Sequence, residues 1–456
     1  MNQTNNYLTQ EKTGKLILKF SIPCIMSLLV ASLYNIVDQI FIGQGIGYLG
    51  NGATNVVFPI TIIALAFALL IGDGCAAYLS ICQGKRDHKG SSNSVGNAIT
   101  IVVIVSVFYT ILLALGQNTF LNAFGATENN YQYAVEYYQI IMLGIPFFMI
   151  ANGLNSVIRA DGNPKFAMIS TLIGALINVI LDPIAIFVLN WGMKGAALAT
   201  IMGQIVSACL ALGYMKNAIS FKLTKSSFVL KKEILSKTVP LGISSFLTQL
   251  SIVVIMAVMN NMLVIHGANS KYGADIPLTV VGIVMKVFQI VIAFVVGIAA
   301  GSQPIVGYNY GAGHFKRVRE IYKKIIIAEC IVGLISMVIF ECFPMQIISV
   351  FGSESNLYNE YAVIAFRIYL FTILLCCVQK STSIFLQSLG KPVMSMGLSL
   401  LRDFLLIVPL VIGLGHFYGV IGLLYSAPIA DVISMIFVVI MMKKVMKELR
   451  MREDFN

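Results

Sequence analysis

The stretch ALINVILDPIAIF, residues 175–187, places an amide, a carboxylate and a proline near the middle of an apolar run that extends from about residue 164 to 190. At a rise of about 1.5 Å per helical residue, a run of this length crosses a hydrocarbon core of about 30 Å. A carboxylate at that depth costs about 3 kcal/mol even on mild insertion scales. The stretch therefore predicts a membrane-spanning helix in which Asp182 either performs a function or is compensated by its neighbours.

Apolar runs of similar length recur along the chain, so we predict an all-α membrane protein. The 456 residues are 58% hydrophobic and 11% charged, whereas a soluble protein carries about 25% charged residues. We predict twelve transmembrane helices, at residues 15–44, 53–83, 94–116, 130–159, 164–190, 192–216, 237–265, 277–310, 318–342, 357–388, 392–415 and 418–443.

The positive charge is concentrated on one side of this topology. The net charge is +11, and nearly all of the 31 Lys and Arg residues lie at the N-terminus, in the even-numbered loops and at the C-terminus. Lys194 and Lys271 are the two that lie in odd-numbered loops. By the positive-inside rule we expect a multi-pass protein of the plasma (inner) membrane with both termini cytoplasmic. The basic surplus indicates contact with anionic membrane lipids and not with a nucleic acid.

The two halves of the chain resemble each other. Gln83-Gly84 corresponds to Tyr310-Gly311, and Pro23 to Pro240, at a nearly constant separation. Each half has an even number of spans, so both copies of the repeat insert in the same orientation. A pseudo-twofold axis along the membrane normal would then relate the two copies. Transporters use this plan; a duplicated membrane enzyme or scaffold is the competing interpretation. We predict an N-terminal lobe, a basic cytoplasmic linker and a C-terminal lobe, at residues 1–216, 217–236 and 237–456.

Polar side chains on three spans of the first half fall at a similar depth, in the outer part of the predicted membrane. No Lys or Arg lies well inside these spans. Two carboxylates brought together in a low-dielectric site can hold a proton, and the same oxygens, with an amide and a hydroxyl, can surround Na⁺. We predict a proton or cation site formed by Asp38, Asn178, Asp182 and Thr200.

A structural interpretation of the two acids stays open. Asp182 can act as a helix N-cap, with Pro183 at the first position of a restarted helix, and Asp38 can be capped by Asn35 or Gln39. In either interpretation Pro183 is the point at which the span can bend. The two interpretations are compatible, because a kinked helix can also carry an ion ligand.

Other charged residues at membrane depth differ between the halves. Asp73, between Gly72 and Gly74, is either a further station on a proton path or a solvated acid. The second half carries three basic and three acidic groups near mid-depth. Equal numbers of both signs favour ion pairing in a structural or gating network, and contact with substrate is the alternative. The six residues are Lys286, Glu329, Arg367, Arg402, Asp403 and Asp431.

Motifs for other classes of function are weak or missing. Gly45-Ile46-Gly47-Tyr48-Leu49-Gly50 fits the GxGxxG pattern, but no strand precedes it, so we expect no nucleotide site. The absence of a Walker A motif argues against ATP as the driving force. No set of Ser, His and acid meets at one depth, which argues against an enzyme. We expect no cofactor beyond a coupling ion, H⁺ or Na⁺.

Several stretches together resemble the multidrug and toxic compound extrusion (MATE) transporters, in the bacterial branch that includes MepA and DinF-like proteins. The resemblance covers essentially the whole chain. The stretches are SIP at 21–23, YNIVD at 34–38, RADGNP at 159–164, NVILDP at 178–183, GAALAT at 195–200 and GYNYGAG at 307–313.

The resemblance implies a cation-coupled antiporter that exports organic cations by alternating access between two six-helix lobes. In the related branch the cation site consists of an Asp in the first span, an Asn and an Asp in the fifth, and a Thr in the sixth. These positions match Asp38, Asn178, Asp182 and Thr200 here, and Asn155 in the fourth span is a further candidate.

NorM-like members of the family carry a cation-binding Glu in the seventh span, but residues 244–249 contain no carboxylate, so we expect the coupling site in the N-terminal lobe. We predict a monomer that exports small amphipathic cations. The nearest alternative is a flippase of the same superfamily for lipid-linked oligosaccharides, in which Lys286, Arg367 and Arg402 bind pyrophosphate. A membrane-embedded enzyme or receptor is a less favoured alternative.

Overall fold

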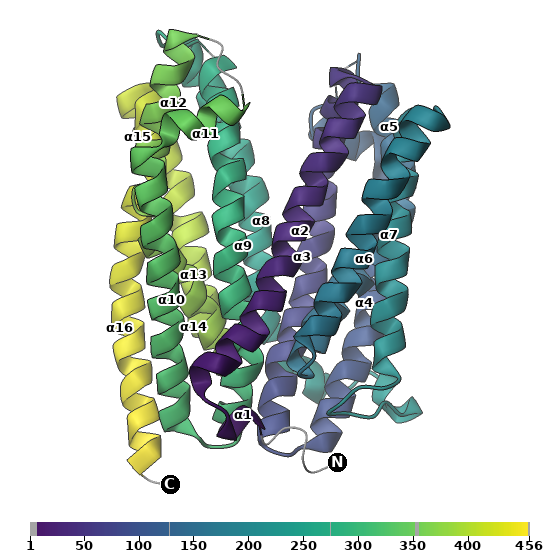
Figure 1. The fold of residues 1–456 in the computed structure, drawn as a ribbon, viewed down its shortest axis with the longest axis vertical. Coiled ribbons are helices and arrows are strands. Elements are labelled where there is room, and N and C mark those ends of the chain that lie inside the picture. Colours follow the sequence, from purple (N-terminus) through teal and green to yellow (C-terminus); the bar gives the residue numbers. More distant parts are fainter. Residues whose placement is uncertain (1–6, 127, 274, 352–354, 455–456) are drawn as a thin grey trace.

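The computed structural model of the protein describes residues 7–126, 128–273, 275–351 and 355–454, and within these ranges it contains helices and no strands. Figure 1 shows two helical bundles side by side, with both chain ends at the same end of the molecule. The elements of the first half are α1 (Tyr7–Gln10), α2 (Thr13–Gly45), α3 (Tyr48–Gly84), α4 (His88–Ala123), α5 (Tyr131–Ala160), α6 (Pro164–Pro183), the π-helix η1 (Ile184–Val188) and α7 (Gly192–Met215).

The second half follows a short 3₁₀ helix in the linker and includes a second π-helix. Its elements are η2 (Lys225–Phe228), α8 (Lys232–Ala268), α9 (Asp275–Gly311), α10 (Phe315–Cys342), α11 (Pro344–Phe351), α12 (Asn356–Tyr369), α13 (Ile373–Ser388), α14 (Pro392–Leu400), the π-helix η3 (Leu401–Leu406), α15 (Ile407–Leu424) and α16 (Ser426–Asp454).

Ten of the described helices are long and apolar enough to cross a membrane, and there are eleven spans if α12 and α13 form one span bent by 46°. The difference from the twelve predicted spans falls near the C-terminus. Gly419 has φ 64° and ψ −150° and interrupts α15, close to the boundary predicted between residues 415 and 418. The helical path then continues into α16, which packs against α10, α13 and α15. The two-lobe, twelve-helix arrangement is therefore consistent with the structure.

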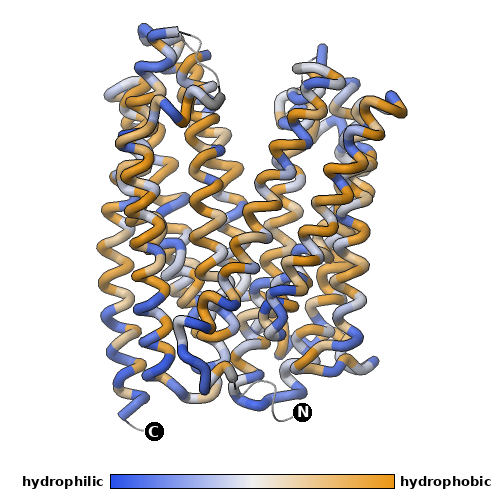
Figure 2. Tube along the Cα trace, in the orientation of Figure 1, coloured by the Kyte–Doolittle hydropathy of each residue, from blue (hydrophilic) through white to orange (hydrophobic). Residues whose placement is uncertain are grey.

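The outer surface of the bundles matches a lipid environment. Apolar residues cover the middle of both bundles, and hydrophilic residues gather toward their ends (Figure 2). Large apolar side chains point outward, and Leu115 and Val393 are 84% and 73% exposed. A wide surface of exposed apolar side chains is unfavourable in water, but it is stable in contact with the hydrocarbon core of a membrane.

Each bundle has its own apolar core. One cluster of buried residues draws only on positions 42–221, and a second draws only on positions 255–430. A third cluster joins Leu8, Leu16 and Phe20 to α9, α10, α13 and α16. The chain is therefore organised as two lobes with a third apolar contact at the end where the chain ends lie.

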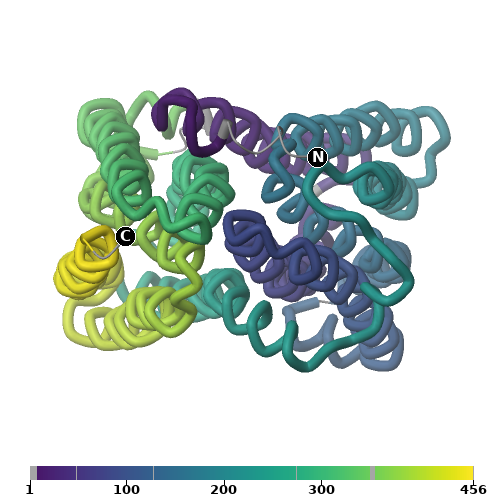
Figure 3. The backbone as a smooth tube through the Cα atoms, turned by 90° about the horizontal axis from the view of Figure 1, so that it is seen from below, coloured from purple at the N-terminus to yellow at the C-terminus, as the bar shows by residue number. Residues whose placement is uncertain are grey.

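This third cluster includes residues near the start of the chain segment predicted as the N-terminal lobe. The start of α2 lies against the second bundle, where Thr13 Oγ1 donates to Glu320 Oε1 at 2.5 Å and accepts from Lys324 Nζ at 2.5 Å. From there α2 crosses to the first bundle (Figure 3). A helix of 33 residues is about 50 Å long, which is enough to pack on both lobes, with Pro23 inside it.

The two bundles touch at the end that holds the chain ends and diverge toward the opposite end (Figure 1). Glycines permit this contact. A Cβ on Gly242 of α8 would lie 1.8 Å from the Leu70 carbonyl oxygen of α3, and a Cβ on Gly84 of α3 would lie 2.1 Å from the Tyr308 carbonyl oxygen of α9. Small residues allow membrane helices to approach backbone to backbone. The lobes therefore meet along α3, α8 and α9.

The linker predicted at residues 217–236 is bound to the first lobe. Asn97 Nδ2 of α4 donates to the carbonyl oxygens of Ser227 at 3.0 Å and Val229 at 2.9 Å, and Asn97 Oδ1 accepts from Lys231 N at 2.8 Å. One amide side chain thus satisfies three backbone groups of the linker. The linker is a folded part of the first lobe's surface.

We expect Asp161→Ala to destabilise this region. The Asp161 carboxylate accepts from Tyr214 Oη (2.7 Å), Ile219 N (2.7 Å), Ser220 N (2.8 Å) and Ser220 Oγ. Removing a buried acceptor that several donors share costs about 3 kcal/mol, so the midpoint of thermal unfolding in detergent should fall. Asp161→Asn keeps one acceptor oxygen and should give an intermediate midpoint. An unchanged midpoint for Asp161→Ala would contradict the proposed stabilising role of the hydrogen bonds to Asp161.

Candidate functional site

Four of the predicted site residues meet inside the first lobe. Asp38 comes from α2, Asn178 and Asp182 from α6, and Thr200 from α7. Asp182 is fully buried and Asp38 is 7% exposed, and their carboxyl groups lie close enough to influence each other electrostatically. Asn178 Nδ2 donates to Thr200 Oγ1 at 3.3 Å. The three helices therefore place these four polar side chains in one cluster.

The oxygens of this cluster have few protein partners. Oδ1 of Asp38, both carboxylate oxygens of Asp182 and Oδ1 of Asn178 are buried and receive no hydrogen bond. In the described part of the chain, no Lys or Arg forms an ion pair with either acid. Two ionised carboxylates that lie close together repel each other, and a proton or a bound cation would remove this repulsion.

Close packing of α6 on α7 sets the position of these side chains. A Cβ on Gly203 of α7 would lie 2.4 Å from the Gly174 carbonyl oxygen of α6. One turn earlier on α6, Ser170 O accepts from Ser207 Oγ of α7 at 2.7 Å. Asn178 lies one turn beyond Gly174, on the same face. The backbone contact thus fixes how far α6 stands from α7 at the site.

The structural interpretations of the two acids do not hold. α6 continues through Asp182 to Pro183, and no backbone N–H bonds to the Asp182 carboxylate, so Asp182 is not an N-cap. The N-cap prediction is wrong because Pro183 is followed by the π-helix η1 and not by a restarted α-helix. Asn35 Nδ2 donates to the Ala31 carbonyl oxygen at 2.7 Å and does not cap Asp38. π-helical turns are frequent at functional sites.

Two tyrosines border the acids and were missed in the sequence. Tyr34 and Tyr137 both lie close enough to interact electrostatically with Asp38 and Asp182, and Tyr137 also lies beside Thr200. Tyr34 precedes Asp38 by four residues on one helix, and this spacing places both side chains on one face. The sequence alone could therefore have predicted Tyr34 as a neighbour of Asp38. Tyr137 comes from α5, and only the packing of α5 on α7 brings it here.

Two further candidates lie outside the cluster. Asn155 Nδ2 donates to Thr171 Oγ1 at 3.4 Å, and Thr171 lies two turns before Asn178, about 10 Å along α6. Asp73 lies where the lobes touch, with its Oδ2 accepting from Ser245 Oγ of α8 at 2.8 Å. Neither side chain is therefore placed to hold the same ion as the two acids.

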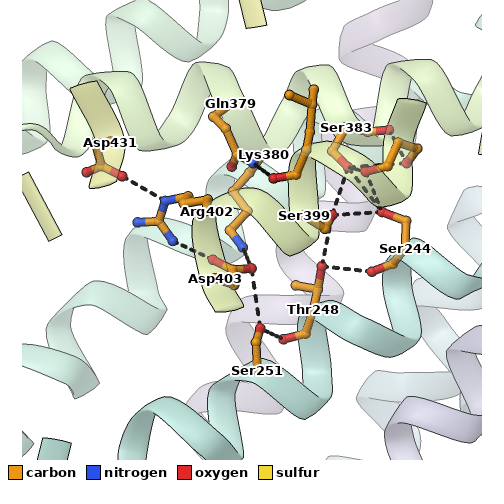
Figure 4. A network of polar contacts seen from close by, with 12 residues as sticks. Ser244, Thr248, Ser251, Gln379, Lys380, Ser383, Ser399, Arg402, Asp403 and Asp431 are labelled. Atoms are coloured by element: carbon orange, nitrogen blue, oxygen red, sulfur yellow. Dashed lines mark hydrogen bonds and ion pairs between the residues drawn. The ribbon is translucent and has the colours of Figure 1, made fainter. Parts of the chain in front are cut away.

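A balanced network of charges lies inside the second lobe (Figure 4). Arg402 Nε donates to Asp431 Oδ1 and Arg402 Nη1 donates to Asp403 Oδ1, each at 2.7 Å. Lys380 Nζ donates to Asp403 Oδ2 at 2.6 Å, and Thr372 Oγ1 donates to Asp431 Oδ2 at 2.7 Å. Two positive and two negative groups thus neutralise one another in a buried site.

Three of the six charged residues predicted for this network lie elsewhere. Glu329 of α10 is fully buried and accepts a hydrogen bond from a serine of α13 at 2.5 Å. Arg367 Nε lies 3.9 Å from Glu341 Oε2, and Lys286 is exposed on α9. Lys380, which was not predicted, supplies the second cation. A similar depth in the membrane did not predict which charged residues meet. Successive helical residues point about 100° apart, so residues at one depth often face different neighbours.

Hydroxyl groups extend the network toward α8. Ser251 Oγ donates to Asp403 Oδ2 at 3.3 Å, and the Ser244 hydroxyl is bonded to those of Ser399 at 2.8 Å and Ser383 at 3.1 Å (Figure 4). The segment 244–249, which lacks a carboxylate, therefore supplies hydroxyls to an internal hydrogen-bond network. The polar interior of the second lobe is largely satisfied by its own groups.

The protein has two helical lobes that meet at one end, and a pair of acids without basic partners lies inside one lobe. This is the architecture of a polytopic membrane protein of the secondary-transporter class. The MatE family model matches residues 23–184 and 245–412. The chain belongs to the MatE family, as its motifs predicted.

Individual relatives agree with this assignment. The multidrug export protein MepA of Staphylococcus aureus (strain MSSA476) is 25% identical over 435 residues, which is 93% of this chain and 92% of that protein. A solved structure described as the outward-facing conformation of a multidrug resistance MATE family transporter matches with a TM-score of 0.91 at 23% identity, covering 98% of this chain and 99% of that one.

A second solved structure is a MOP superfamily transporter from Pyrococcus furiosus whose reverse polarity of the binding pocket is described as suggesting a different function. It matches with a TM-score of 0.91 at 22% identity, covering 99% of this chain and 100% of that one. These likenesses show that the chain shares the fold of both structures.

We expect Arg402→Met to be more damaging than Lys380→Met. Without Arg402, Asp431 keeps only a hydroxyl donor, and breaking a buried ion pair on one side costs about 3–5 kcal/mol. Without Lys380, Asp403 keeps its bond to Arg402. Thermal unfolding in detergent should show the larger fall in midpoint for Arg402→Met. Equal midpoints for the two variants would contradict a network centred on Arg402.

Proposed function

We propose that this protein is a cation-coupled antiporter that exports small amphipathic organic cations across the plasma membrane. The observation that carries the proposal is the pair of buried acids Asp38 and Asp182, whose oxygens are unbonded and which have no basic partner among the described residues. Asn178 and Thr200 complete the site. The name of the similar S. aureus protein, a multidrug exporter, supports export of several compounds.

The two acids provide a switch between two states of the lobe. With one proton or one cation bound, the carboxyl groups attract a shared positive charge and remain in contact. With no ion bound, two charges about 4 Å apart repel by about 4 kcal/mol at an effective dielectric constant of about 20. A difference of that size shifts a conformational equilibrium by about a thousandfold. Pro183 and η1, directly after Asp182, provide the place where α6 adjusts.

We propose H⁺ as the coupling ion, with Na⁺ as the alternative. Sodium prefers several oxygen ligands around one point, and four unbonded oxygens from Asp38, Asp182 and Asn178 are available. Two carboxyl groups close together in a low-dielectric site can instead share one proton, which needs no further ligands. Both ions are therefore tested separately below.

The lobe contact supplies groups suited to the substrate. Phe67 of the first lobe and Phe246 of the second have ring centroids 5.1 Å apart, so aromatic rings from both lobes meet on the path between them. Aromatic faces attract organic cations. The positive-inside rule places both termini in the cytoplasm, so the diverging end of the lobes faces outward. We propose that a monomer carries out this cycle.

The flippase alternative is weakened by the ion pairs of the second lobe. Arg402 is held by two carboxylates, and Arg367 lies near Glu341, so neither guanidinium is free for pyrophosphate. Of the three basic residues required, only Lys286 has no ion pair among the described residues. A single exposed ammonium is a poor match for a group with several negative charges.

We expect Asp182→Asn to abolish ion-driven uptake of a cationic dye into everted membrane vesicles. The variant keeps the shape of the side chain but cannot carry an exchangeable proton or charge. Uptake is measured with a pH gradient and with a Na⁺ gradient imposed separately, and we expect the wild type to respond to the pH gradient. Uptake by the variant should fall to the level of vesicles that lack the protein.

The matched control is Asp87→Asn in the same lobe. Asp87 caps α4 by accepting from Gly90 N at 2.8 Å, and Asn caps a helix as well as Asp does, so uptake should stay at the wild-type level. If Asp182→Asn, at normal expression, retains wild-type uptake under both gradients, the proposed coupling site is wrong.

A further inference from the structure

Asp73 of α3 joins side chains of both lobes. Its Oδ1 accepts from Ser156 Oγ of α5, in the same lobe, at 2.7 Å, and its Oδ2 accepts from Ser245 Oγ of α8, in the other lobe, at 2.8 Å. Arg159 Nη2 donates to Ser156 Oγ at 2.7 Å and lies 4.0 Å from Asp73 Oδ1. One carboxylate thus has an anchor in its own lobe and a partner across the lobe contact.

The second lobe holds Ser245 in place for this contact. Gln387 Nε2 of α13 donates to Ser245 Oγ at 3.3 Å and to the Leu241 carbonyl oxygen at 2.6 Å. The hydrogen-bonded chain from Arg159 through Ser156, Asp73 and Ser245 to Gln387 therefore runs from one lobe into the other. Its single bond between lobes is the one between Asp73 and Ser245.

The backbones of the two lobes are in close contact directly beside this bond. A Cβ on Gly74, next to Asp73, would lie 2.4 Å from the Thr238 carbonyl oxygen of α8. Phe246, next to Ser245, contacts Phe67, which lies six residues before Asp73 on α3, about 9 Å along the helix. The bond therefore lies within the backbone contact and below the aromatic pair, toward the end that holds the chain ends.

We infer that Asp73 is a positioning residue that latches the two lobes together at the end where the chain ends lie. The inference rests on the proposed alternating-access function, because only a protein that opens at that end must break the bond to Ser245. Opening breaks this bond and leaves Ser156 and Arg159 on the carboxylate. The acid is never left without a partner, so the latch can open and close repeatedly.

The latch is separate from the ion site. Asp38 and Asp182 lie inside the first lobe, whereas Asp73 lies at the contact between lobes and pairs with Arg159. Asp73 need not exchange a proton to perform this role. Its contribution is a charge-assisted hydrogen bond, which is stronger than a bond between neutral groups. Loss of the bond should raise the population that is open at this end by about tenfold, the change that corresponds to one such bond.

Two serine variants separate the latch from local structure. Ser245→Ala removes the bond between lobes, and Ser156→Ala removes a bond of similar length to the same carboxylate within one lobe. Ser245→Thr keeps the hydroxyl and serves as the rescue variant. All three are made in the full chain, and the midpoint of thermal unfolding shows that each one folds.

The readout is a distance between lobes, measured by pulsed electron paramagnetic resonance. Spin labels are placed at Lys85 and Lys316, which are exposed residues of the first and second lobe, with the exposed Cys209 and Cys342 replaced by Ser. We expect Ser245→Ala to raise the long-distance population by about tenfold, and Ser156→Ala and Ser245→Thr to match the parent. An unchanged population in Ser245→Ala, or an equal rise in Ser156→Ala, overturns the latch.

The distance measurement needs no ion gradient and no substrate. If Asp182→Asn proves to transport normally, the coupling site fails while the distances still report on the latch. If Ser245→Ala leaves the distances unchanged while Asp182→Asn abolishes uptake, the latch fails and the coupling site stands. The two results are therefore distinguishable.

Discussion

The cost of an uncompensated charge in a low-dielectric interior is the constraint on which this structure depends. Asp38 and Asp182 meet inside the first lobe with four side-chain oxygens of the cluster unbonded. A purely structural pair of acids would acquire donors or basic partners, because a folded protein pays a penalty for each buried group left unsatisfied. These two acids are therefore the part of the first lobe whose charge is not compensated by its own described side chains.

The two lobes meet the same constraint in different ways. Glu329 Oε2 in the second lobe is buried without a hydrogen bond, but Asp403 and Asp431 are neutralised by Lys380 and Arg402, and Ser251 adds a hydroxyl donor to Asp403. These cations are tethered and cannot leave. The two lobes thus have similar helices but different electrostatics, because Asp403 and Asp431 are paired with basic side chains, whereas Asp38 and Asp182 have no basic partner among the described residues.

Much of the fold and part of the site were open to prediction from the sequence. Hydropathy and charge asymmetry located the spans, since both follow from the solvent at each depth. Asp38, Asn178, Asp182 and Thr200 were found because polar groups stand out in apolar runs. The N-cap prediction for Asp182 was wrong because a π-helical turn after Pro183 cannot be read from local propensity. Lys286, Arg367 and Glu329 were placed in the wrong network because depth does not specify a helix face.

The sequence by itself determined the membrane environment, the two-lobe repeat, the family and the identity of the two acids, since each depends on composition, spacing or motif. Only the tertiary structure decided which side chains meet. Tyr137 reaches the acids through packing of α5 on α7, Lys380 reaches Asp403 from another helix, and Asp73 bonds to Ser245 across the lobe contact. These contacts depend on helix rotation and crossing, which glycines such as Gly203 and Gly242 set through backbone contact, and no local pattern encodes them.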